Sequence, residues 1–216
     1  MRKSKKQPRT ALGKVWYFIW EDDSALSWIV NIILAIILIK FVVYPGLGLA
    51  LGTQFPIVAV VSDSMEHNNY PQSKGLSFNE WWKNHAEFYD SKNISYSEFR
   101  EFPFKNGFNK GDLMILKKAE PSKIEKGDII VFSGWRSDPI IHRVVEIEKQ
   151  DGYYIFGTKG DNNPRQIAPT AGCSICDETS IHQNQIYGKA VLRVPYLGWV
   201  KIIAFDAFMT IVNIFR

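Results

Sequence analysis

The sequence has few of the residues that mark disordered, fibrous or disulfide-built proteins. Two cysteines are too few for a disulfide scaffold, and only 22% of the residues are charged while 46% are hydrophobic. This composition excludes a disordered tail, a collagen-like fibre and a polytopic membrane protein. A length of 216 residues is typical of one compact domain with an additional segment.

The net positive charge of the chain comes from its first residues. Six basic residues precede the first acid, Glu21, so that a chain of net charge +4 carries −2 over residues 21–216. The six residues are Arg2, Lys3, Lys5, Lys6, Arg9 and Lys14. Because the rest of the chain is slightly acidic, the sequence argues against a nucleic-acid-binding domain and predicts no nucleic acid partner.

A long hydrophobic run, WIVNIILAIILIKFVVYPGLGLAL, occupies residues 28–51. As a helix it would measure roughly 36 Å and could cross a bilayer core of roughly 30 Å. It predicts a transmembrane anchor in the cell membrane, with residues 1–27 in the cytoplasm and the following domain outside, because cations favour the cytoplasmic side. The alternatives are a buried core helix and a signal peptide cleaved near Gly48-Leu49-Ala50, although signal peptides have shorter hydrophobic regions.

Residues 52–198 predict a mainly β, extracytoplasmic domain. Lys-Gly-Asp tripeptides at 110–112 and 126–128 lead into apolar runs, as expected of turns, whereas the third, at 159–161, leads into Asn162-Asn163-Pro164 and indicates a different loop. The predicted strands, rich in β-branched and aromatic residues, are 57–61, 113–116, 129–132, 140–147, 153–156 and 186–194.

Two segments depart from the strand pattern. Residues 66–109 predict a small helical, aromatic-rich insertion, because Ser77 and Glu80 have the spacing of a capping box and aromatic residues follow at helical intervals. Its aromatic residues predict either a satellite core or a surface that rests on lipid headgroups. Residues 199–216 predict an amphipathic or membrane-associated helix, because they are short for a second crossing.

Three segments supply the residue types of nucleophilic acyl transfer. Ser62 and Ser64 follow the first predicted strand, His142 interrupts a later strand, and Asp161 lies in the loop at 159–163. A serine hydroxyl needs a base to accept its proton and an acid to orient that base. Taken alone, a serine in a loop is a weak signal, and a lone histidine in a strand more often has a structural role.

The ordered set of motifs resembles that of type I signal peptidases, specifically the archaeal and endoplasmic-reticulum branch. The bacterial branch has a lysine base where this chain has His142. The resemblance covers about residues 28–66 and 110–200. Its motifs are SDSME at 62–66, GDIIVF at 127–132, IHRV at 141–144, KGDNN at 159–163, GKA at 188–190 and VPYLG at 194–198.

The resemblance implies an antiparallel β catalytic domain on a membrane anchor, and a serine endopeptidase that cleaves signal peptides from secretory preproteins. Ser64 would be the nucleophile, His142 the general base, and Asp161 the acid that orients it. The Ser64 backbone N–H and the Ser62 hydroxyl would form the oxyanion hole. Preproteins and membrane lipid would be the partners, with no cofactor and no metal.

The chain departs from the family pattern near both ends of the candidate site. Asp63 and His67 stand where the family usually has Gly and Pro, which makes His67 an alternative base. A second Asp is absent at 166–167, and Asp177 is its candidate replacement. Cys173 and Cys176 form a disulfide, half of a zinc site with His182, or remain unpaired.

Two alternative functions stay open. One is a related membrane-bound serine protease with a different substrate. The other is a non-catalytic, membrane-anchored β module that binds secreted partners, in which His142 and Asp161 have structural roles only.

Overall fold

The computed structural model describes residues 10–67, 77–136 and 138–214. Most of the basic N-terminal residues, residues 68–76 of the predicted insertion and the last two residues of the predicted C-terminal helix lie outside the described residues. The chain divides into two compact units, Met1–Ala50 and Leu51–Arg216.

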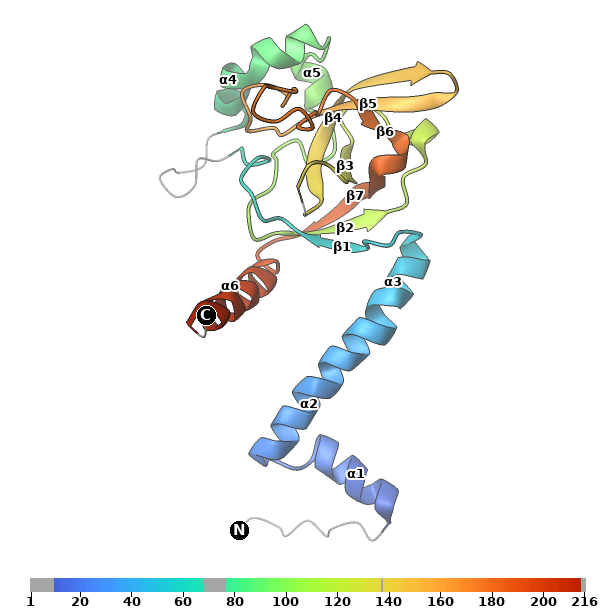
Figure 1. Cartoon of the computed structure of the whole chain (residues 1–216), viewed down its shortest axis with the longest axis vertical. Helices are drawn as coiled ribbons and strands as arrows, with labels where there is room; N and C mark the ends of the chain where they lie inside the picture. The colour runs from blue at the N-terminus through green and yellow to red at the C-terminus, as the bar shows by residue number, and fades with distance from the viewer. Residues whose placement is uncertain (1–9, 68–76, 137, 215–216) are drawn as a thin grey trace. The chain divides into compact units, whose positions relative to one another are not determined.

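The first unit is helical. A short helix, α1 (Ala11–Trp20), was not predicted; it precedes α2 (Ala25–Leu38), which continues through one π-helical turn, η1 (Ile39–Val43), into α3 (Tyr44–Leu51) (Figure 1). The continuous helix Ala25–Leu51 has 27 residues and a mean hydropathy of 2.6, and is long and apolar enough to cross a membrane. It includes the whole hydrophobic run that predicts the anchor.

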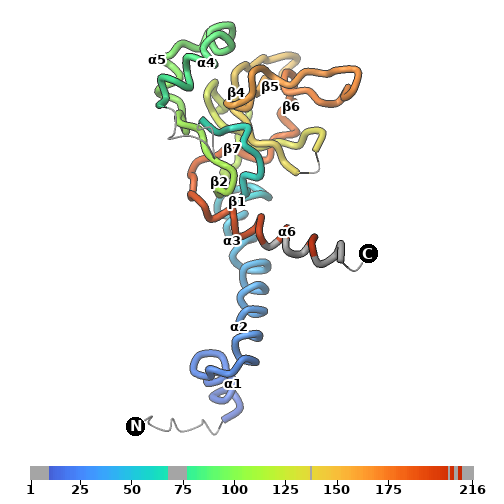
Figure 2. The backbone as a smooth tube through the Cα atoms, turned by 90° about the vertical axis from the view of Figure 1, so that its left-hand side faces the viewer, coloured from blue at the N-terminus to red at the C-terminus, as the bar shows by residue number. Residues whose placement is uncertain are grey.

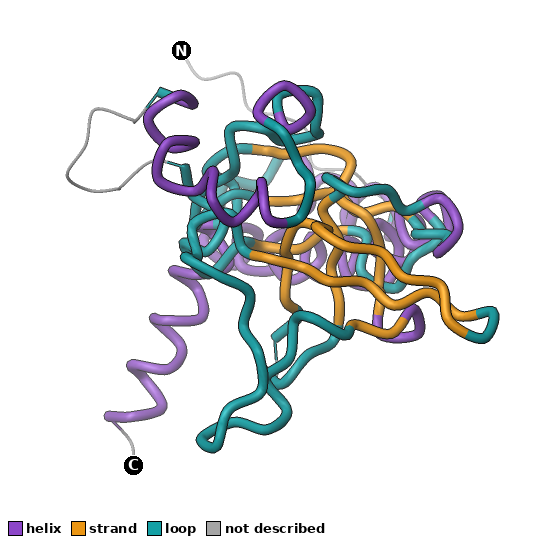
Figure 3. The backbone as a smooth tube through the Cα atoms, turned by 90° about the horizontal axis from the view of Figure 1, so that it is seen from above, coloured by secondary structure: helices purple, strands orange, loops and turns teal. Residues whose placement is uncertain are grey.

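The second unit is built on a seven-stranded antiparallel sheet, which confirms the predicted fold class. The strand order is β1-β2-β7-β3-β4-β5-β6, and the sheet is curled when it is seen from above (Figure 3). The strands are β1 (Ile57–Ala59), β2 (Leu113–Lys117), β3 (Ile129–Phe132), β4 (Ile140–Gln150), β5 (Tyr153–Lys159), β6 (Ile181–His182) and β7 (Ile186–Val194).

Six of these strands match predicted strands. β1 ends two residues early, because the Val60 N–H donates to the Asp112 carbonyl outside the regular ladder. The two-residue strand β6 was not predicted, since so short a segment shows no alternation. Two short 3₁₀ turns, η2 (Pro121–Lys123) and η3 (Gln183–Gln185), connect strands that are consecutive in the sequence but not adjacent in the sheet.

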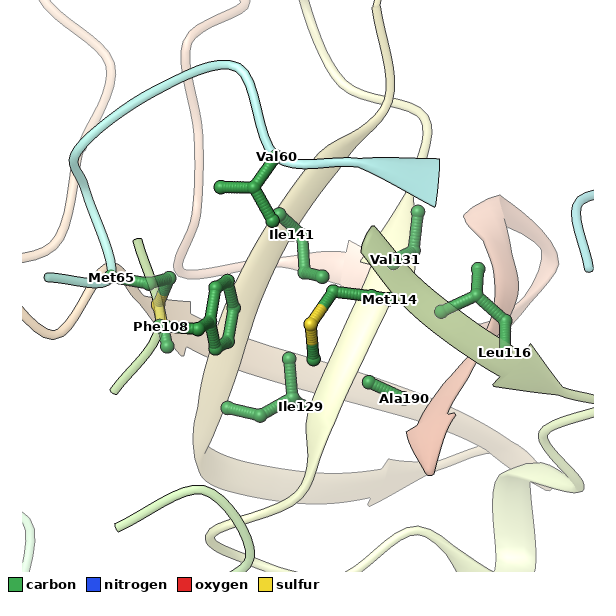
Figure 4. Close-up of a cluster of buried hydrophobic side chains, with 9 residues drawn as sticks. All are labelled: Val60, Met65, Phe108, Met114, Leu116, Ile129, Val131, Ile141 and Ala190. Carbon is green, nitrogen blue, oxygen red and sulfur yellow. The ribbon is translucent and has the colours of Figure 1, made fainter. Parts of the chain in front are cut away.

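The core lies on both faces of β3. Its side chains alternate, so that Ile129 and Val131 belong to one buried cluster and Ile130 and Phe132 to another. All four residues are buried, as expected of a central strand that is covered on both sides. The first cluster contains Val60, Met65, Phe108, Met114, Leu116, Ile129, Val131, Ile141 and Ala190 (Figure 4).

The predicted insertion contains α4 (Phe78–Ser91) and α5 (Tyr96–Phe99), which lie beside β4 in two views (Figures 1 and 2). The capping box is present: the Ser77 hydroxyl accepts from the Glu80 N–H, and the Glu80 carboxylate accepts from the Ser77 N–H. The aromatic residues form a satellite core, as the first alternative predicts, made of Trp81, Trp82, Tyr89, Ile94, Phe99 and Val145. The chain ends in α6 (Trp199–Ile214).

Candidate active site

Ser64 lies in the loop that follows the edge strand β1. Its hydroxyl oxygen is 2.9 Å from His142 Nε2 and 3.2 Å from the Ser62 hydroxyl oxygen. The serine and the histidine are 78 positions apart in the sequence. The fold therefore brings the predicted nucleophile and the predicted base into hydrogen-bond contact.

His142 is held by the sheet. It lies on β4 directly opposite Ile130 of β3, and only 5% of it is exposed. Its other ring nitrogen, Nδ1, contacts the Glu178 carboxylate oxygen Oε1. When the ring proton is on Nδ1 and is donated to this carboxylate, Nε2 is free to accept the proton of Ser64.

Glu178 is the site residue that the sequence did not predict. It is fully buried, and its second carboxylate oxygen accepts from the Ile167 N–H at 2.9 Å. Its backbone N–H donates to the Ile167 carbonyl at 2.8 Å, and its carbonyl accepts from the Thr158 N–H at 2.7 Å. The one available signal was its position next to Asp177, ahead of the last strands.

The Asp161 carboxylate contacts other groups than the expected imidazole of His142. It is fully buried, and one of its carboxylate oxygens accepts from Arg143 Nε at 2.8 Å and from the Tyr89 hydroxyl at 2.9 Å. The other accepts from Arg143 Nη2 at 2.6 Å and contacts His67 Nε2 at 2.9 Å. Among the hydrogen bonds of the described residues, none joins Asp161 to His142. The expected contact is therefore corrected: Asp161 pairs with Arg143, and Glu178 faces the imidazole.

The charge of Asp161 is stabilised in the interior. Burial alone would raise its pKa, but the Arg143 charge and the hydrogen bonds from His67 and Arg143 lower the pKa well below its usual range. Arg143 is also fully buried, and its guanidinium donates to the carbonyls of Pro103 and Gly127 at 2.9 and 2.8 Å. This ion pair has hydrogen-bond partners on both sides, as a buried pair requires.

The turn that contains Asp161 supports the nucleophile. The Asn162 N–H donates to the Ser64 carbonyl at 2.8 Å, and the Asn162 side-chain amide donates to the Asp63 carbonyl at 3.1 Å. A Cβ on Gly160 would lie 2.8 Å from the Ser64 carbonyl oxygen and 2.9 Å from His142 Nε2. The close approach of this turn to the Ser64 backbone and the His142 ring therefore requires glycine.

The two remaining sequence candidates make other contacts. Asp177 accepts from the Thr179 N–H and hydroxyl at 2.7 and 2.6 Å. His67 stacks on Trp81 with ring centroids 3.6 Å apart and turns its Nε2 to Asp161, and burial lowers its pKa. Neither residue has a hydrogen bond with Ser64 or His142 in the part of the chain that is described.

A cavity of about 230 Å³ opens at the candidate site. Ser62, Ser64 and His142 line it together, so a bound peptide could reach the serine hydroxyl. Most of the remaining lining is apolar, and comes from residues that include Ala59, Val61, Trp135, Pro139, Ile140 and Ile167. The polar lining also includes Asp63, Arg136, Asp138 and Asn163, so apolar and polar groups converge on the serine, as in many substrate sites.

Cys173 and Cys176 form a disulfide, the first of the three predicted alternatives. No group of three or more His, Cys, Asp or Glu side chains able to hold a metal occurs among residues 10–67, 77–136 and 138–214. The zinc alternative with His182 therefore has no support in the described chain.

An antiparallel sheet that brings a serine hydroxyl and an imidazole to one cavity, with a buried carboxylate in contact with the imidazole, defines a candidate hydrolase site, because these groups can together carry out acyl transfer. Curated relatives confirm the resemblance to type I signal peptidases.

The signal peptidase complex catalytic subunit SEC11C of Homo sapiens is 36% identical over 101 residues, which cover 46% of this chain and 51% of that protein. The sec11 catalytic subunit of Dictyostelium discoideum is 35% identical over 101 residues and covers 46% and 54%. Signal peptidase I W of Bacillus subtilis is 40% identical over 57 residues and covers 26% and 30%. The chain thus spans about half the length, or less, of these relatives. No family model matches it.

Proposed function

We propose that this protein is a membrane-bound serine endopeptidase that cleaves signal peptides from secretory preproteins. The observation that carries the proposal is the 2.9 Å contact between Ser64 Oγ and His142 Nε2 at the wall of the cavity. The relatives support the substrate class, because their names identify them as signal peptidases.

The proposed mechanism starts with proton transfer from the Ser64 hydroxyl to His142 Nε2 while the serine oxygen attacks the scissile carbonyl carbon. The imidazolium then gives this proton to the leaving amine, and His142 activates the water that hydrolyses the acyl-enzyme. The Ser64 backbone N–H and the Ser62 hydroxyl donate to the oxyanion, and each donor contributes about 3–4 kcal/mol to transition-state stabilisation.

The membrane part of the proposal rests on the helix Ala25–Leu51. Residues 28–51 anchor the chain, residues 1–27 lie in the cytoplasm, and residues 52–198 form the extracytoplasmic peptidase domain, with residues 199–216 on the membrane. An anchored enzyme searches for a membrane-inserted signal peptide in two dimensions. If the anchor is not cleaved, N-terminal sequencing of the membrane-bound protein should find Met1. An N-terminus at about residue 51 would instead identify residues 28–51 as part of a removed signal peptide.

The test is cleavage of a radiolabelled secretory preprotein by the detergent-solubilised full chain. We expect one processed product, which is absent with Ser64→Ala, with His142→Ala and with His142→Lys, because a lysine here would be protonated unless it were strongly desolvated. Ser97→Ala and His182→Ala are matched controls, since Ser97 is exposed and His182 caps a 3₁₀ turn.

Each alternative predicts a different result. A folded protein that binds preproteins without processing them would be the non-catalytic β module. Cleavage of other membrane proteins, with preproteins left intact, would indicate the related protease. Activity that survives in His142→Ala and is lost in His67→Ala would assign the base to His67.

A further inference from the structure

We propose that Glu178 is the positioning carboxylate of this site and orients His142 in the role that the sequence assigned to Asp161. The inference rests on the proposed function, because orienting an imidazole matters only if that imidazole is the base. It adds a residue that lies outside the motifs of the family resemblance.

Both oxygens of the Glu178 carboxylate have defined partners. Oε1 contacts His142 Nδ1, and Oε2 accepts from the Ile167 N–H at 2.9 Å. The side chain is fully buried, so water does not compete for either oxygen. A carboxylate held in this way keeps the ring proton on Nδ1 and stabilises the imidazolium that forms when Ser64 loses its proton.

The backbone around Glu178 is fixed as firmly as its side chain. Glu178 and Ile167 are joined by a backbone hydrogen bond of 2.8 Å, and the Thr158 N–H bonds to the Glu178 carbonyl at 2.7 Å. Residues 168–177 thus form a loop with a closed base. Within it, the Cys173–Cys176 disulfide and a bridge between Thr170 and Cys173 shorten the free chain. At the end of this loop the Glu178 backbone pairs with Thr158 of β5, and its carboxylate contacts the His142 ring.

Asp161 cannot take the same role in this arrangement, because its oxygens are already used. They accept from Arg143 and Tyr89 and contact His67, and the carboxylate neutralises the buried guanidinium. The two buried acids therefore have different roles. Asp161 pairs with Arg143 and stabilises the turn next to Ser64, whereas Glu178 orients the imidazole of His142.

The test compares Glu178→Gln with wild type in preprotein cleavage. Glutamine keeps an acceptor oxygen but removes the charge, so kcat should fall by about 10⁴-fold, as when the acid of a serine protease triad is neutralised, while KM stays within about twofold. Glu178→Asp restores the charge at a shorter reach and should give an intermediate kcat. Glu148→Gln is the matched control, because Glu148 lies exposed on the same strand as His142.

A spectroscopic measurement tests the contact without turnover. A histidine Nδ1–H that donates to a carboxylate gives a low-field proton resonance, and we expect this resonance in wild type and in Ser64→Ala. It should be absent in Glu178→Gln and in His142→Ala. This measurement separates failure of the proposed function from failure of the proposed role of Glu178. A wild-type protein that shows the resonance but cleaves no preprotein contradicts the proposed function alone.

Three results would overturn the proposal itself. One is a Glu178→Gln protein with wild-type kcat and an unchanged resonance. Another is a Glu178→Gln protein that loses activity through a raised KM or a collapsed melting temperature with the resonance intact, which indicates a structural role. The third is an inactive but stably folded Asp161→Asn or Asp177→Asn protein beside an active Glu178→Gln protein, which would place the acid at residue 161 or 177.

Discussion

Neutralising Asp161 should affect stability first, because its carboxylate is the counter-charge of a fully buried arginine. In Asp161→Asn the Arg143 guanidinium keeps its backbone acceptors but loses its only carboxylate partner among the described residues. Tyr89 and His67 also lose the anionic acceptor that they contact. The substitution therefore leaves an uncompensated charge in the interior.

The magnitude follows from this arrangement. Removing one partner of a buried ion pair typically costs about 3–5 kcal/mol. In a domain of this size each kcal/mol lowers the melting temperature by about 2–4 °C, so the melting temperature should fall by about 6–20 °C. Tyr89→Phe is the matched comparison, because it removes one hydrogen bond to Asp161 and leaves the ion pair. Tyr89→Phe should lower the free energy of unfolding by about 1.5–3 kcal/mol, because the lost hydrogen bond is to a charged group.

Thermal unfolding of the detergent-solubilised chain, followed by circular dichroism, measures both variants. The pH dependence has a definite sign: because the folded-state pKa of Asp161 is lowered, its contribution is present above the unfolded pKa of about 3.9 and is lost as the pH falls below it. The advantage of wild type over Asp161→Asn should therefore shrink with acidification below about pH 4. A variant that melts within 2 °C of wild type at neutral pH, on the order of half a kcal/mol, would refute the reasoning.

Three further predictions concern the surroundings of the site. Gly160→Ala should lower kcat at least about tenfold, because the new methyl group would displace the Ser64 carbonyl or the imidazole. Reducing the Cys173–Cys176 disulfide should lower the free energy of unfolding by at most about 2 kcal/mol, because the disulfide closes a very short loop. The melting temperature should therefore fall only slightly. Burial lowers the pKa of Lys159 to about 8, so the free energy of unfolding of wild type, measured against Lys159→Met, should rise between about pH 8 and 10.4. A flat difference across that range would contradict the burial of the ammonium.

The strands and the insertion helix were predictable because their signals are local. β2 and β3 are short apolar runs that follow a Lys-Gly-Asp turn, and α4 begins at a capping box that needs only four consecutive residues. The sequence did not predict β6 and α1, for two different reasons. β6 is too short to show a period, and α1 lies between a basic segment and a hydrophobic run that dominates the pattern.

The site was predictable only in part, because its members are joined by the tertiary fold. Ser64 and His142 stood out as polar residues beside or within apolar strands, and the contact between them is present. The choice among Asp161, Asp177 and Glu178 depends on how a loop closes at Ile167, which spacing does not show. Nor did the sequence reveal that Arg143, next to the histidine, would bind the carboxylate of Asp161.

The contact between the insertion and the ion pair also limits how this protein can be shortened. Tyr89 donates to Asp161, and the Arg143 guanidinium lies 4.7 Å from the centre of the Phe99 ring, so both helices of the insertion cover charged groups of the sheet. A deletion that joins residue 66 to residue 107, although these residues are bridge partners, would open a salt bridge to water beside the nucleophile. A minimal version of the domain therefore has to keep both the sheet and the insertion.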